Sequence, residues 1–162
     1  MRTEQAIGEF YERNARDVWT YAYRVTGNAA DADDIVQEAF LRLFGTERLP
    51  DDDEELRRYV FRVAGNLMAD RWRRRVRDTR AAVTEPEAGL PRGADIDVVR
   101  TFSELKRRER ALLWLAYVEG DSHTEIAASL RLGRDSVKVL LSRARAHLRD
   151  LLVARGLNTR ER

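Results

Sequence analysis

The residue types best suited to chemistry lie in two blocks of opposite charge within the first half of this 162-residue sequence. Residues 26 to 55 contain ten acidic and two basic residues, and residues 57 to 80 contain nine arginines and two aspartates. Rows of carboxylates suit a basic protein surface, and clustered guanidinium groups suit phosphate oxygens. The pattern therefore predicts a chain that contacts both a basic protein surface and a polyanion.

The basic block ends in five arginines among the seven residues from Arg71 to Arg77, the arginine cluster. Asn66 and Asp70, just before it, are one helical turn apart, so they share a face and could hydrogen-bond base edges. Trp72 lies between arginines, where it could stack on a base or pack inward as a core anchor. The arginines themselves could also be a solvated helix end that complements the macrodipole.

The acidic block opens with the residues from Asp31 to Glu38, at the expected start of a helix. Acids at that place favour the helix dipole, so a purely local role is one interpretation. Asp34 and Glu38 are also one turn apart, with Gln37 and Leu41 nearby. A row of carboxylates edged by leucine predicts docking against a basic partner helix.

Apolar residues at three- and four-residue steps predict the helices that hold these blocks. Gly27 ends the first helix, and Gly45 and Pro50 interrupt the chain after the second. The third helix continues into the arginine cluster. The apolar stripes of the three predicted helices cover residues 7–25, 32–43 and 56–68.

Residues 79–97 differ in composition, with two prolines, two glycines and no aromatic residue, which predicts a flexible linker. A second helical block follows, and no strand-like alternation is present. The predicted fold class is therefore all-α, with two small helical domains joined by a linker. The predicted divisions are a first domain over residues 1–78, the linker over 79–97, a second domain over 98–155 and a tail over 156–162.

The second block contains a capping box, Ser122 to Glu125, which predicts the start of a short helix that ends at Leu130. A break at residues 131–133 leads into a longer helix. A short helix, a tight turn and a second helix with a basic outer face form the helix-turn-helix pattern, although a basic face can also be merely solvated. On a helical wheel the core-facing residues of the longer helix are Val137, Leu141, Ala144, Leu148 and Leu151.

Other features exclude several function classes. The sequence has no cysteine, which rules out disulfides and thiolate metal sites and favours a reducing cytosol. His123 and His147 lie far apart, and no nucleophile–base pair or glycine-rich phosphate loop is present, so we expect no metal, no cofactor and no enzymatic activity. The N-terminal residues lack a signal-peptide core and no apolar run is long enough to span a membrane, which predicts a cytoplasmic protein.

In their order, these parts resemble the extracytoplasmic-function (ECF) sigma factors of bacterial RNA polymerase. Residues 31–40 resemble the segment that docks on the clamp helices of the largest polymerase subunit. Residues 64–71 are similar to the helix that recognises the −10 promoter element. Residues 117–127 and 136–145 resemble the helix-turn-helix that binds the −35 element.

The resemblance implies a factor that binds core RNA polymerase and directs promoter-specific initiation, while phosphodiester chemistry belongs to the polymerase. Further implied partners are the flap of the second-largest subunit, promoter DNA and an anti-sigma factor. The implied core-polymerase contacts are Asp31, Asp34, Gln37, Glu38 and Leu41. The implied −10 contacts are Asn66, Asp70, Arg71, Trp72, Arg73, Arg74 and Arg75. The implied −35 contacts are Arg134, Ser136, Lys138, Val139, Ser142 and Arg143.

Two other functions stay open at this point: a stand-alone helix-turn-helix DNA-binding regulator, and an interaction module that occupies polymerase without starting transcription. The acidic block argues against the first, because a simple repressor has no need of it. Val139 and Leu140 stand where the family typically has Ser-Arg, which suggests the second. An exposed Val139 predicts contact with a thymine methyl in the major groove of the −35 element, or with an anti-sigma helix.

Overall fold

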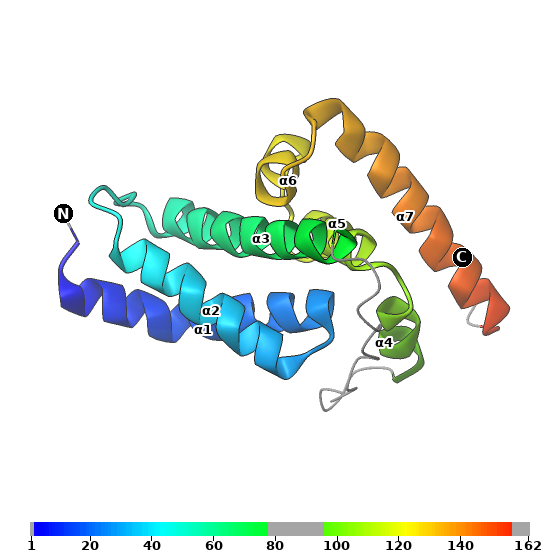
Figure 1. The fold of residues 1–162 in the computed structure, drawn as a ribbon, viewed down its shortest axis with the longest axis horizontal. Coiled ribbons are helices and arrows are strands. Elements are labelled where there is room, and N and C mark those ends of the chain that lie inside the picture. Colours follow the sequence, from blue (N-terminus) through cyan, green and yellow to red (C-terminus); the bar gives the residue numbers. More distant parts are fainter. Residues whose placement is uncertain (1, 78–95, 157–162) are drawn as a thin grey trace.

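The computed structural model describes residues 2–77 and 96–156, and over these residues the chain forms seven α-helices and no strand (Figure 1). The predicted all-α fold class is confirmed. The first half supplies α1 (Glu4–Thr26), α2 (Ala29–Phe44) and α3 (Asp53–Arg77). The second half supplies α4 (Ile96–Ser103), α5 (Arg107–Tyr117), α6 (His123–Leu130) and α7 (Arg134–Ala154).

Local side-chain signals set the ends of the first two helices. The Thr3 hydroxyl accepts a hydrogen bond from the Ala6 amide at the start of α1, and the Asn28 side chain accepts one from the Asp31 amide at the start of α2. Gly27 ends α1 with a left-handed φ of 69°, a conformation that glycine adopts without strain. The chain therefore turns sharply between the two helices, and α2 packs back along α1.

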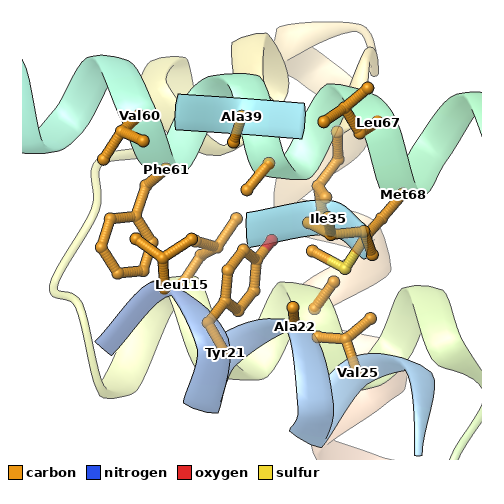
Figure 2. Close-up of a cluster of buried hydrophobic side chains, with 14 of the residues drawn as sticks. Tyr21, Ala22, Val25, Ile35, Ala39, Val60, Phe61, Leu67, Met68 and Leu115 are labelled. Atoms are coloured by element: carbon orange, nitrogen blue, oxygen red, sulfur yellow. The ribbon is translucent and has the colours of Figure 1, made fainter. Parts of the chain in front are cut away.

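The three N-terminal helices enclose the centre of the core (Figure 2). Tyr21 of α1, Ile35 of α2 and Met68 of α3 are fully buried there. Burial of an aliphatic or aromatic side chain contributes about 1.5–3 kcal/mol, so this interior is the main source of stability for the first half. This shared interior fixes the position of α2 relative to the end of α3 that carries the arginine cluster.

The helices of the second half follow the predicted helix-turn-helix. Ser122 accepts a hydrogen bond from the amide of Glu125, and the Glu125 carboxylate accepts one from the amide of Ser122, so the capping box is confirmed. In α7 the predicted core residues Val137, Leu141 and Ala144 are buried. The last two residues of that stripe, Leu148 and Leu151, are only partly buried and pack at the edge of the core.

The two halves pack directly on each other, which nothing in the residue pattern indicated. Helix α6 lies on α3 (Figure 1), and α5 packs against α1. Leu115 of α5 belongs to the same buried cluster as Tyr21 and Phe61 from the first half (Figure 2). Residues 79–95 of the predicted linker and residues 157–162 of the predicted tail lie outside the described residues, as does residue 78 at the end of the predicted first domain.

Candidate polymerase-binding and nucleic-acid-binding surfaces

The acidic block forms the outer surface of α2. Asp34 and Gln37 are exposed, and Leu41 is 63% exposed, an unusual value for a leucine in a packed helix. Gln37 and Leu41 also line a groove of about 600 Å³ between α1 and α2, the α1–α2 groove. The predicted row of polar side chains edged by leucine is therefore present and accessible.

Two aromatic residues extend this apolar edge, and the sequence did not assign them to the site. Tyr11 is 43% exposed and Phe44 is 51% exposed, and both line the α1–α2 groove. Tyr11 lies within the predicted apolar stripe of residues 7–25, but its ring lies edge-on against Phe40 on the rim of the groove, with the two ring centroids 4.8 Å apart. The sequence contained one indication of this extension, because an apolar residue at the end of the acidic helix, Phe44, lies one turn after Leu41.

Two acids of α2 pair with the arginine cluster on α3. Asp31 pairs with Arg75 at 3.3 Å, and Glu38 pairs with Arg71 at 3.7 Å as well as with Arg42 at 2.9 Å. Exposed ion pairs of this kind each contribute little, at most about 1 kcal/mol, so they are readily exchanged for a partner's charges.

The arginines of the cluster differ in their contacts and in their exposure. Arg73 donates a hydrogen bond to the carbonyl oxygen of Arg131 at 2.9 Å, whereas Arg74 is exposed. Trp72 is partly buried and packs against the core, in agreement with its interpretation as a packing residue. Arg107 at the start of α5 adds to the positive region: burial lowers its pKa, and the nearby Arg75 lowers it further.

Asn66 and Asp70, the predicted base-reading residues, contact the second half of the chain. The Asn66 side-chain amide donates to the carbonyl oxygens of Ala128 and Ser129, both at 3.0 Å. Asp70 pairs with Arg131 at 3.0 Å. The structure therefore brings the predicted −10 residues together with the turn between α6 and α7.

The six predicted −35 residues all lie on the exposed side of α7. Val137 on the opposite side is fully buried, so the helix separates a core face from an outer face as the wheel predicted. Val139 is 50% exposed, and packing does not explain its apolar side chain. The exposed residues of this outer face are Arg134, Ser136, Lys138, Val139, Ser142 and Arg143.

A second groove, of about 580 Å³, lies between α4, α5 and α7, the α4–α7 groove. No residue pattern indicated this groove, because its lining comes from α4, α5 and α7 together with Arg24 of α1. Arg145 of α7 donates a hydrogen bond to the Tyr117 hydroxyl at 2.8 Å at its edge. Its apolar lining includes Val98, Phe102, Trp114, Leu148, Leu152 and Val153.

Within residues 2–77 and 96–156, no three histidine, aspartate or glutamate side chains are grouped closely enough to hold a metal ion. None of the helices described there is both long enough and apolar enough to cross a membrane.

Comparisons with known proteins identify two sigma-factor regions, one in each half of the chain. The family model of Sigma-70 region 2 matches residues 10–78, and that of Sigma-70 region 4 matches residues 96–148. The ECF RNA polymerase sigma factor SigL of Mycobacterium tuberculosis is 31% identical, over 91% of this chain and 89% of that protein. The RNA polymerase sigma-E factor of Streptomyces coelicolor is 30% identical, over 94% and 89%.

Among solved structures, the fold is similar to the sigma factor RpoE of Bartonella quintana, crystallised in complex with the anti-sigma factor NepR. The TM-score is 0.64 at 18% identity, over 90% of this chain and 95% of that one. Because two sigma region models match in order, and because the relatives align over most of their length, this chain belongs to the ECF RNA polymerase sigma factors, which are promoter-recognising initiation factors.

Proposed function

We propose a division of labour within this sigma factor, in which α2 binds core RNA polymerase, the C-terminal half of α3 binds the −10 element, and α7 reads the −35 element. One observation supports the proposal most strongly. A single chain carries an acidic surface edged by exposed apolar residues and, on a separate helix, an exposed polar and basic face. These are the surfaces needed for a basic protein partner and for DNA.

The polymerase contact would be made on the clamp helices of the largest subunit. Asp34, Gln37 and Leu41 are exposed and suit such a contact directly. Asp31 and Glu38 would exchange their arginine partners for basic groups of the polymerase. The aromatic rim of the α1–α2 groove would add Tyr11 and Trp19, residue types that are enriched among the few that carry most of the binding energy at an interface.

The −10 contact would combine phosphate binding with base recognition. Arg71, Arg73, Arg74 and Arg75 would neutralise phosphates, and Trp72 would support the helix or stack on a base. Asn66 and Asp70 carry the short polar side chains that suit hydrogen bonds to base edges. The −35 contact would place the outer face of α7 in the major groove, with Lys138 and Arg143 beside Val139.

The α4–α7 groove suits an apolar helix from the flap of the second-largest polymerase subunit. Its size and its apolar lining from Phe102, Trp114 and Leu148 support this assignment. We further propose that an anti-sigma factor regulates the chain, since the similar fold of Bartonella quintana was crystallised with one. The protein would act in the cytoplasm, without a cofactor and without enzymatic activity of its own.

Run-off transcription with core polymerase over a promoter library tests the proposal. Wild-type protein should yield transcripts that share −35 and −10 sequences. The triple variant with Arg73, Arg74 and Arg75 changed to alanine should bind core polymerase normally but open promoters poorly, as read by permanganate footprinting of the −10 region. Capture of core polymerase without any transcript would indicate an interaction module. Tight sequence-specific binding by the free chain at physiological salt would indicate a stand-alone regulator.

A further inference from the structure

The surface of α3 that carries the predicted −10 residues is covered by the second half of the chain. Asn66, Asp70 and Arg73 follow one another at steps of four and three residues, so they lie on one face of α3. All three contact the C-terminal end of α6 or the turn that follows it. The contact therefore coincides with the surface proposed to read DNA.

Asn66 acts here as a cap for α6. The last carbonyl groups of a helix have no partner within the helix, and the Asn66 amide donates to two of them, on Ala128 and Ser129. The same amide group also donates to the carbonyl oxygen of Arg62 at 2.7 Å. Because the amide has two hydrogens, its donor capacity is fully used in this arrangement and none remains for a base edge.

Arg131, which follows α6, binds the next turn of α3. Its side chain pairs with Asp70 at 3.0 Å, and its backbone carbonyl accepts from Arg73 at 2.9 Å. Arg131 ends α6 in the left-handed conformation, with a φ of 54°, so its carbonyl and its side chain both reach α3 from one position. Two of the predicted −10 contacts are thus occupied by a single residue of the second half.

Gly65 allows α3 and α6 to approach each other closely. A Cβ atom at this position would lie 2.8 Å from the carbonyl oxygen and 3.1 Å from the Cβ atom of Ser129, closer than packed atoms tolerate. Glycine inside a long helix weakens that helix relative to alanine. The close contact with the buried Ser129 supplies the reason for a glycine in the middle of α3.

We propose that Gly65, Asn66, Asp70, Arg73 and the α6–α7 turn form an autoinhibitory latch, which must open before α3 can bind promoter DNA. In the closed state the chain's own helix end occupies the groups that would read the −10 element. The apparent affinity for DNA is then reduced by the fraction of molecules that are open. The inhibitory role rests on the proposed −10 function of Asn66 and Asp70, whereas the latch itself rests on the contacts alone.

The variant Gly65→Ala tests the latch in the full-length chain. The added methyl group should stabilise α3 as a helix and at the same time wedge Ser129 away from it. Gly8→Ala is the matched control, because Gly8 lies in α1 with nothing within 4 Å of a Cβ atom. It gives the same gain in helix propensity without touching the latch.

The opening can be measured by electron–electron distance spectroscopy, because the sequence has no cysteine of its own. Spin labels on cysteines replacing the exposed residues Glu12 and Ala146 report the separation of α1 and α7. We expect one narrow distance distribution for the wild type and for Gly8→Ala, and a longer, broader one for Gly65→Ala. A wild type that is already broad, or a Gly65→Ala variant that stays narrow, overturns the latch.

Binding of a labelled, mixed-sequence single-stranded DNA of about 15 nucleotides tests the inhibition. If about one wild-type molecule in ten is open, Gly65→Ala should bind about tenfold more tightly, with Gly8→Ala unchanged. An opened variant that gains no affinity overturns the inhibitory role. Run-off transcription by the wild type judges the proposed sigma function separately, since a latch that fails leaves that activity intact.

Arg131→Gly is a second variant, which tests the latch without adding a side chain to the packed contact between α3 and α6. It removes the ion pair with Asp70 and places at the left-handed position the residue that prefers it. It should widen the distance distribution and raise DNA affinity in the same direction as Gly65→Ala but by less, at most about fivefold, because a partly exposed ion pair contributes little and the backbone carbonyl that accepts from Arg73 remains. A folded Arg131→Gly protein with the wild-type distance and affinity would contradict the latch.

Discussion

The guanidinium group of Arg110 in α5 is buried against the last turn of α1, where it binds the carbonyl oxygen of Val25. Its Nε and Nη2 atoms donate to that oxygen at 3.0 and 2.6 Å, and its Nη1 atom donates to the Ser103 carbonyl at 2.6 Å. Burial lowers the pKa of Arg110 to about 10, and the nearby Arg107 adds to the decrease, so the group stays charged at neutral pH. A charged donor from the second half thus satisfies a free carbonyl at the end of α1.

Arg110→Ala should lower the free energy of unfolding by about 3 kcal/mol, because buried carbonyls lose a charged donor. Urea unfolding followed by circular dichroism measures this change. Arg108→Ala is the control, since Arg108 is exposed on the same helix and its loss should change stability by less than about 0.5 kcal/mol. Equal stability of the two variants would mean that the Arg110 contact does not hold the halves together.

Tyr21→Phe should stabilise the protein. The Tyr21 hydroxyl is buried at the centre of the core and has no hydrogen-bond partner among the described residues. Burial raises its pKa, helped by Asp121 and Glu119, so the phenol stays neutral. Removing an unsatisfied buried hydroxyl should contribute about 1 kcal/mol and raise Tm by about 2–4 °C. Tyr11→Phe at the exposed groove rim should change Tm little, and a Tyr21→Phe variant that melts earlier would show that the hydroxyl is satisfied.

The stability of the wild type should fall as the pH rises from near 4 to about 6. Burial raises the pKa of Asp121 from 3.8 to about 6, with further increases from Glu125 and Glu119 that Arg58 and Arg57 partly oppose. A carboxyl whose pKa is higher in the folded state binds more protons there, so deprotonation disfavours folding. The loss is complete above the folded pKa.

Asp121→Asn should therefore be more stable than the wild type above pH 6, and the advantage should disappear near pH 4. Thermal melts over this pH range test the difference, with Asp150→Asn as the control for loss of an exposed carboxylate. The gain should be modest, because the Asp121 side chain is only partly buried. A gain of the same size at pH 4 and pH 8 would contradict the assignment.

The double variant Asp34→Lys, Leu41→Ala should weaken capture by core polymerase at least about tenfold, which corresponds to about 1.4 kcal/mol. Both residues are exposed, so helicity should stay unchanged. Glu38 is a poorer choice, because its loss would also free Arg42 and Arg71. Glu47→Lys, at an exposed acid outside the groove, is the matched charge control. Unchanged capture would mean that these residues do not bind core polymerase and that the acids of α2 only stabilise the start of the helix.

Val139→Ser should reduce recognition of thymine in the −35 element. The exposed valine suits apolar contact with the thymine methyl group, which the major groove displays. Replacing thymine by uracil in the −35 element removes this methyl alone and should weaken wild-type transcription. Indifference of the wild type to uracil, together with no effect of Val139→Ser on either template, would favour a protein partner for this face.

The sequence by itself determined the helices and their faces. The capping box at Ser122, the stop at Gly27 and the burial of Val137 opposite Val139 were all predicted and are confirmed. These features depend on residues within a few positions of one another, because helical hydrogen bonds and amphipathic stripes span three or four residues. The exposure of the predicted −35 face follows from the same periodicity.

The tertiary structure alone decided how the two halves meet. The partners of Asn66 and Arg110 are backbone carbonyls, which every residue carries, so no residue type in the sequence marks them. The role of Gly65 depends on a neighbour 64 positions away at Ser129, and the rim position of Tyr11 depends on how α1 lies against α2. Such contacts depend on the shapes of packed surfaces between distant segments, and periodicity within one helix contains no information about them.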